Sequence, residues 1–118
     1  MDIINIILAA LTAVFGAFGF IAPRWTASVL DLEPIRTNMG LSEIRASTGG
    51  LFVALGLGAI LIGTPMAYGM MGIAYVGAAS GRLLSIFTDS PPRSKALLYF
   101  AIEAAFAAWL VGYNLIAA

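Results

Sequence analysis

The sequence predicts an all-α membrane protein in which four transmembrane helices form an antiparallel bundle. Hydrophobic residues make up 61% of the 118 residues and charged residues only 10%, whereas soluble domains carry about 25% charged residues. The apolar residues fall into four long stretches, each close to the roughly 20 residues that cross a bilayer as a helix. Short polar connections use the remaining residues. The chain 1–118 is therefore predicted to be a single bundle without a soluble domain.

Helix-breaking residues set the limits of the four predicted spans. The spans cover residues 3–22, 42–63, 66–88 and 94–116. Pro23 ends the first span, because proline cannot continue a helix interior. Gly63 ends the second span, and Pro91 follows the third. Ser42 or Asn38 is expected to cap the second span, since both residue types are good N-caps.

The longest connection, residues 24–40, is polar but contains Trp25 followed by further apolar residues. A short interfacial helix with Trp25 at the level of the lipid headgroups fits this pattern. An irregular loop fits it equally well, so the sequence leaves both alternatives open.

Small residues recur along every predicted span. Close helix contact in lipid depends on such residues, because lipid is as apolar as leucine and drives no hydrophobic association. The rows predicted to face inward are Ala9, Ala13 and Ala17 with Gly16; Ala46, Gly50, Ala54 and Gly58 with Gly49 and Gly56 beside them; Gly77 and Gly81; and Ala101, Ala105 and Ala108, continued by Gly112. The alternative is that one of these rows contacts another protein.

Four ionisable residues fall inside the predicted spans. They are Glu43, Arg45, Arg82 and Glu103. At 1.5 Å of rise per residue, Arg82 lies roughly 10 Å before the end of its span and Glu103 roughly 12 Å into the next one. The two spans must be antiparallel, so these two side chains are predicted to pair. Glu43 and Arg45 lie at a shallower depth on the same side of the membrane.

Three interpretations of this charged set remain open. It forms a structural clamp in which two acids and two arginines neutralise one another; or it is a polar site that binds a ligand headgroup or relays protons; or Glu43 and Arg45 simply extend to the interface. Tyr75 precedes Arg82 by seven residues on the same helix face, and it could line a cleft for an amphipathic molecule such as a quinone or lipid.

The distribution of positive charge predicts the orientation of the chain. All six Lys and Arg residues lie on or near the side of the connections at 23–41 and 89–94. The positive-inside rule places these connections in the cytoplasm and both termini outside.

The composition also excludes several kinds of site. The chain has no His and no Cys, which removes the usual ligands of zinc and haem and any thiol redox chemistry. Its Lys and Arg are scattered among an equal number of Asp and Glu, so no basic patch suits nucleic acid. We expect no metal site and no nucleic-acid partner.

Two motifs resemble a known family. Residues 42–57 read SEIRASTGGLFVALGL and residues 81–92 read GRLLSIFTDSPP, and Glu103 follows at the last acidic position. Together they are similar to an uncharacterised bacterial family of four-span proteins, a domain of unknown function distantly similar to DoxX-like membrane proteins. The resemblance implies a four-helix bundle in the bacterial inner membrane with Glu43, Arg45, Arg82 and Glu103 as its polar set. It implies no reaction.

The function expected from these observations is an accessory or scaffolding subunit of a larger membrane complex, without catalysis of its own. Its partners would be the lipid bilayer and other membrane subunits or a second copy of the chain. The alternative is a binding or transport module for a quinone or lipid at the Arg/Glu cluster, with Tyr75 beside it. A redox enzyme that borrows a cofactor from a partner is a third, less favoured reading. No cofactor of its own is expected.

Overall fold

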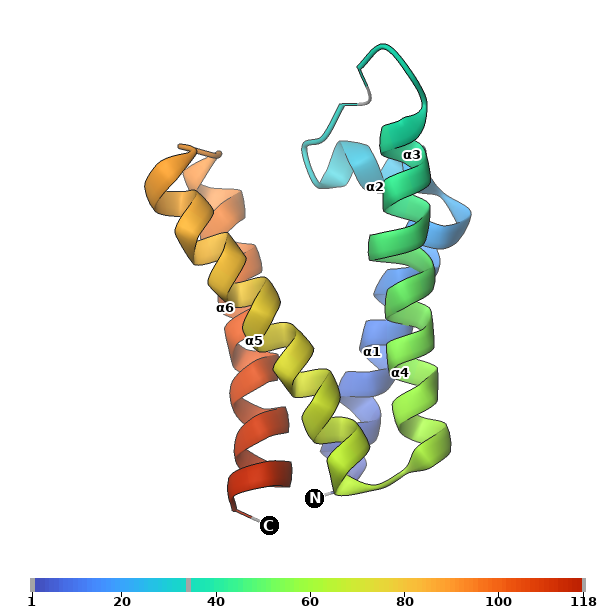
Figure 1. The fold of residues 1–118 in the computed structure, drawn as a ribbon, viewed down its shortest axis with the longest axis vertical. Coiled ribbons are helices and arrows are strands. Elements are labelled where there is room, and N and C mark those ends of the chain that lie inside the picture. Colours follow the sequence, from blue (N-terminus) through green and yellow to red (C-terminus); the bar gives the residue numbers. More distant parts are fainter. Residues whose placement is uncertain (1, 34, 118) are drawn as a thin grey trace. The chain divides into compact units, whose positions relative to one another are not determined.

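The computed structural model describes residues 2–33 and 35–117, and these residues form helices joined by turns, with no strand among them (Figure 1). Four helical segments are long and apolar enough to cross a membrane. They are Ile3–Ile21, Met39–Ile62, Pro65–Thr88 and Arg93–Ile116. The predicted fold class is confirmed, and the observed segments agree with the predicted spans to within three residues at each end. The protein is a multi-pass membrane protein.

The chain divides into two compact units, residues 1–62 and residues 63–118. We call them the N-terminal unit and the C-terminal unit and describe each by itself. Each contains two of the four long segments. A single bundle of all four spans stays a prediction.

In the N-terminal unit, α1 (Asp2–Ile21) is followed after one residue by the short helix α2 (Pro23–Val29). Pro23 explains the break, because its ring lacks the N–H that would continue α1 and its fixed φ suits the first position of a new helix. The connection after the first span therefore begins with a helix, as one of the two sequence-based alternatives expected.

The second long segment of this unit is built from three consecutive elements. These are α3 (Met39–Glu43), the π-helix η1 (Ile44–Gly50) and α4 (Leu51–Ile62). Asn38 occupies the N-cap position but makes no side-chain capping bond. Instead, Thr37 Oγ1 accepts a hydrogen bond from Met39 N at 3.2 Å. Ser42 lies inside the helix, so neither residue caps it as predicted. No feature of the sequence indicated the π-helix.

Glycines bring α1 into backbone contact with η1 and α4. A Cβ added to Gly16 would lie 2.6 Å from Val53 N, and one added to Gly49 would lie 2.6 Å from Phe20 N. A Cβ on Gly56 would meet the carbonyl oxygen of Ala9 and lie 2.8 Å from Ala13 N. Only glycine permits this approach, which is the contact mode expected of helices in lipid.

Ala9 and Ala13 of the predicted row on α1, and Gly16 beside that row, lie at this contact. The predicted row on the second span does not. Gly58 has open space around its Cβ position, and Gly50 meets only ordinary contacts with Phe20 and a carbonyl oxygen. Ala46 and Ala54 are exposed. The contact uses Gly49 and Gly56, which are seven residues apart rather than four.

In the C-terminal unit, α5 (Pro65–Thr88) pairs with α6 (Arg93–Val111), which continues as the π-helix η2 (Gly112–Ile116). Thr64 caps α5, since its Oγ1 accepts a hydrogen bond from Ala67 N at 3.2 Å. The short turn after Thr88 includes Ser90 in the left-handed region at φ 50°. Two prolines follow Ser90, and α6 begins directly after them, so the two helices run antiparallel.

The packing of α5 on α6 also relies on glycine, at positions near the start of α5. A Cβ on Gly72 would lie 2.7 Å from Leu110 Cβ, and one on Gly69 would collide with Leu115. The predicted rows in these helices are not at this contact. Gly77 and Gly81 have open space at their Cβ positions, and Ala101, Ala105 and Ala108 are exposed.

Two glycines of α4 provide a matched test of the close contact. We expect Gly56→Ala to lower the free energy of unfolding by about 1–3 kcal/mol, because the new methyl group has no room against the backbone of α1. We expect Gly58→Ala, two residues away in open space, to leave stability unchanged or raise it by up to ~1 kcal/mol. Equilibrium unfolding in mixed detergent–SDS micelles measures both. Equal effects of the two substitutions would contradict this account of the packing.

Candidate functional site: an ion pair between two spans

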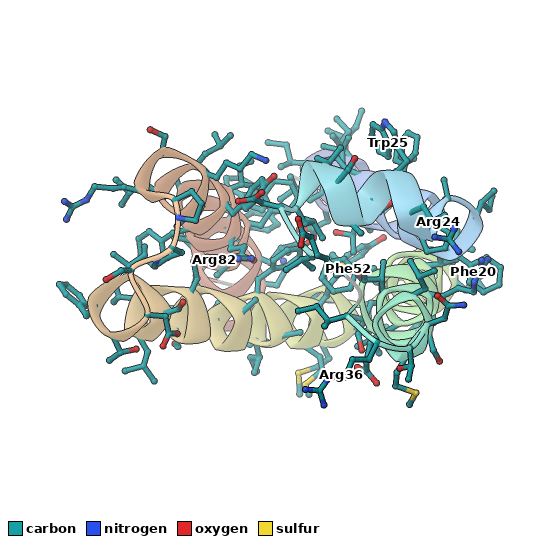
Figure 2. The ribbon with its side chains drawn as sticks, turned by 90° about the horizontal axis from the view of Figure 1, so that it is seen from above. Phe20, Arg24, Trp25, Arg36, Phe52 and Arg82 are labelled. Atoms are coloured by element: carbon teal, nitrogen blue, oxygen red, sulfur yellow. The ribbon has the colours of Figure 1, made fainter. Side chains whose placement is uncertain are left out.

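An arginine and a glutamate form a two-pronged ion pair within the C-terminal unit. Arg82 Nε donates to Glu103 Oε1 at 3.1 Å, and Arg82 Nη2 donates to Glu103 Oε2 at 2.8 Å. Figure 2 shows Arg82 lying between α5 and α6. The planar guanidinium matches both carboxylate oxygens at once, which makes this geometry stronger and more directional than a single contact.

The pairing follows from the depth of the two residues in their helices. Arg82 is seven residues before Asp89, and Glu103 is eight residues after Lys95, so each lies roughly 10–12 Å from the turn that joins the helices. An antiparallel hairpin then sets them side by side. The predicted pairing of Arg82 with Glu103 is confirmed.

Tyr99 completes the surroundings of the pair. Arg82 Cζ lies 5.4 Å from the centroid of the Tyr99 ring, within the range of a cation–π contact. Tyr99 precedes Glu103 by four residues, so both side chains share one face of α6. The sequence analysis missed Tyr99. The four-residue spacing from Glu103 was the signal that could have identified it.

The pair is not fully enclosed. The side chain of Glu103 is 15% exposed and that of Arg82 is 35% exposed. A guanidinium carries five N–H donors, and the fork to Glu103 uses one on Nε and one on Nη2. Within the part of the chain that the structure describes, Arg82 Nη1 has no hydrogen-bond acceptor. The pair is therefore neutral overall but retains a donor edge for an acceptor oxygen.

Tyr75 lies two helical turns from the pair on the same helix. Its ring packs on Phe106 of α6, with centroids 5.1 Å apart and planes at 59°. The side chain is almost fully buried at 6% exposure. In this hairpin Tyr75 fills the contact between α5 and α6, which is a packing role.

Arg45 of the N-terminal unit binds a backbone carbonyl. Its Nη1 donates to Phe20 O at 2.6 Å. The last carbonyls of a helix have no partner within the helix, and a cation at that end also suits the helix dipole. Helix α1 ends just before Pro23. Arg45, which lies in η1, caps the C-terminal end of α1.

Glu43 is exposed, and its Oε2 accepts a hydrogen bond from Ser47 Oγ at 3.1 Å, one turn further along the helix. Glu43 and Arg45 each have a hydrogen-bond partner within the N-terminal unit. Their convergence with Arg82 and Glu103 into one cluster stays a prediction.

Residues of the turn between α5 and α6 line a hollow of about 200 Å³. They are Ile86, Ser90, Pro91 and Arg93. This hollow is at the helix ends, well away from the depth of the ion pair. Among the described residues, no three His, Cys, Asp or Glu side chains come together as a metal site would require.

Comparisons with known proteins give one result. The family model described as "Domain of unknown function (DUF4345)" matches residues 1–113. No curated protein and no solved structure matches the chain.

Breaking the ion pair tests its contribution to stability. We expect Glu103→Gln to lower the free energy of unfolding by about 1–2 kcal/mol. This value is at the lower end of the cost of removing one partner of a charged pair, because Arg82 is partly exposed to solvent. The exchange of the two residues (Arg82→Glu with Glu103→Arg) should restore part of the loss. Glu43→Gln, an exposed control, should change stability by no more than ~0.5 kcal/mol. A double-mutant cycle without coupling between positions 82 and 103 would contradict the clamp.

Proposed function

This chain belongs to the family described as Domain of unknown function (DUF4345), which names no reaction, and we propose its role from its own geometry. It is a small integral membrane protein that acts as an accessory or scaffolding subunit of a larger membrane complex and carries out no catalysis of its own. Its partners are the bilayer and either other membrane subunits or a second copy of the chain.

The observation that carries this proposal is a small-residue face on α5 that α6 does not cover. Gly77 and Gly81 are four residues apart, and nothing lies within 4 Å of their Cβ positions. Rows of this kind let the backbone of another transmembrane helix approach closely. Leu or Ile at such positions would project side chains that keep the backbone of a neighbouring helix at a distance.

The ion pair supports the same role. Arg82 and Glu103 satisfy each other in a two-pronged contact. An intramembrane charged residue is costly unless it is paired, and this pair fixes the register of α5 against α6. It thus holds the hairpin rigid, as a scaffold for other helices requires.

We place the protein in the bacterial cytoplasmic membrane as part of this proposal. The connections at 23–41 and 89–94, with Arg24, Arg36, Arg93 and Lys95 in or beside them, would face the cytoplasm and both termini the outside. Labelling of cysteines introduced at Arg36 and Thr64 tests the orientation, since the chain has no native Cys.

Association through the open face has a direct test. The tagged protein should be recovered in mild detergent with additional subunits or as an oligomer, as measured by native mass spectrometry. We expect Gly77→Leu to remove that association while α5 and α6 remain folded, because the side chain occupies the space that a partner backbone needs. Gly58→Leu, at a position with equally open surroundings on α4, is the control for added bulk. Recovery of the unaltered protein only as a monomer would contradict the proposal.

A second function is favoured by one specific observation, the donor edge of Arg82. The Arg82 side chain is 35% exposed, and its Cζ lies 5.4 Å from the centroid of the Tyr99 ring. We propose, as the alternative, that a small amphipathic molecule such as a quinone or lipid places an oxygen there. The distant similarity to DoxX-like proteins belongs to this alternative.

The two functions respond differently to substitution of Arg82. If a ligand binds at this edge, Arg82→Ala should eliminate the quinone or lipid that co-purifies with the protein, as measured by mass spectrometry of the extract, and Glu103→Gln should retain part of it. Arg45→Ala, in the other unit, is the control. If Arg82→Ala lowers only the free energy of unfolding, the ligand alternative is wrong and the clamp remains.

A further inference from the structure

We infer that α2 (Pro23–Val29) is a lipid-binding helix that lies in the headgroup layer of the membrane, with Trp25 against the acyl-chain carbonyls and Arg24 on a lipid phosphate. Its partner is the zwitterionic phospholipid of the surrounding leaflet. This inference does not depend on the proposed function, since it concerns another part of the chain.

Helix α2 lies directly after the end of a span. α1 is a predicted span that ends at Ile21, and α2 begins two residues later at Pro23. The second long segment begins at Met39 on the return of the chain. Helix α2 is therefore tied by its first residue to the end of a span, at the boundary between hydrocarbon and water.

The side chains of α2 divide into a buried face and an outer face. Pro23, Thr26 and Ala27 are buried. The outer face carries two adjacent rows at four-residue spacing, Arg24 with Ser28 and Trp25 with Val29. One row is polar and the other apolar, which is the division expected of a helix at a membrane interface.

Trp25 of α2 continues the exposed aromatic surface of the first span. The Trp25 ring packs on the Phe18 ring with centroids 5.3 Å apart and planes at 44°. Phe18 belongs to α1 and is 48% exposed, and Trp25 is 55% exposed. Figure 2 shows Trp25 projecting outward from α2, in a different direction from Arg24. Lipid that covers Phe18 therefore also reaches Trp25.

Charge identifies the kind of lipid. Arg24 and Arg36 are the two basic residues of segment 22–38, and Asp31 and Glu33 are its two acidic residues. The segment carries no net charge, so attraction to anionic lipid, which needs a cluster of uncompensated basic residues, is not the basis of binding. Two apolar side chains that follow α2 are also exposed, Leu32 at 50% and Ile35 at 74%.

Fluorescence of Trp25 tests the inference. Trp109→Phe leaves Trp25 as the one tryptophan of the chain, which has two. In phosphatidylcholine vesicles we expect lipids brominated near the headgroup end of the acyl chain to quench Trp25 more strongly than lipids brominated near the chain end, and aqueous iodide to quench it weakly. The depth should correspond to the roughly 5–10 Å burial of interfacial helices. Quenching by iodide alone, or strongest quenching near the chain end, would overturn the inference.

Replacement of part of the phosphatidylcholine by phosphatidylglycerol distinguishes the lipid classes. We expect the quenching profile to remain the same, because the segment is neutral. Quenching by brominated lipid that occurs only with the anionic lipid present would overturn the assignment of the partner.

A second measurement avoids the change at Trp109. The chain has no Cys, so single spin labels at Trp25→Cys and Ser28→Cys report on the two rows of α2. The label at 25 should collide more often with oxygen, which concentrates in lipid, and the label at 28 more often with a water-soluble nickel chelate. Equal accessibility of the two labels to the chelate would contradict the inference.

Discussion

Hydrocarbon offers no hydrogen bonds, and this constraint determines how the protein treats each polar group in its spans. Among the described residues of the spans, five side chains donate a hydrogen bond to a carbonyl one turn back in their own helix: Thr12 to Leu8, Thr48 to Ile44, Ser80 to Val76, Thr88 to Leu84 and Asn114 to Leu110. Each distance is between 2.7 and 2.9 Å. Each of these bonds gives a polar side chain a partner inside its own helix, where lipid offers none.

The two arginines inside the spans meet the constraint differently. Arg82 pairs with a carboxylate on the neighbouring helix. Arg45 donates to a main-chain oxygen at the C-terminal end of α1, just before Pro23. The same residue type thus binds a side chain in one unit and a main-chain carbonyl in the other.

The sequence predicted the features that depend on composition and on position along the axis. Helix limits followed from Pro23 and Pro91, and the depth of Arg82 and Glu103 predicted their pairing. The sequence did not predict features that depend on which side of a helix faces its neighbour. The target of Arg45 is a carbonyl, which has no signature in the sequence. Four-residue spacing favoured Gly58, whereas the contact uses Gly56, because a row at that spacing drifts around the helix and leaves the contact.

The buried positions of α1 and α5 follow a different spacing from the predicted four-residue rows. In α1, Asn5, Ala9, Thr12, Gly16 and Gly19 are separated by alternating steps of four and three residues; Tyr68, Gly72, Tyr75 and Ala79 repeat the pattern in α5. This is a heptad with a mean period of 3.5 residues. A stripe of that period winds slowly around a helix of about 3.6 residues per turn, so helices that follow it coil about one another with left-handed sense. Insertion of one residue within such a stripe would rotate everything beyond it by about 100° and turn the glycines toward lipid.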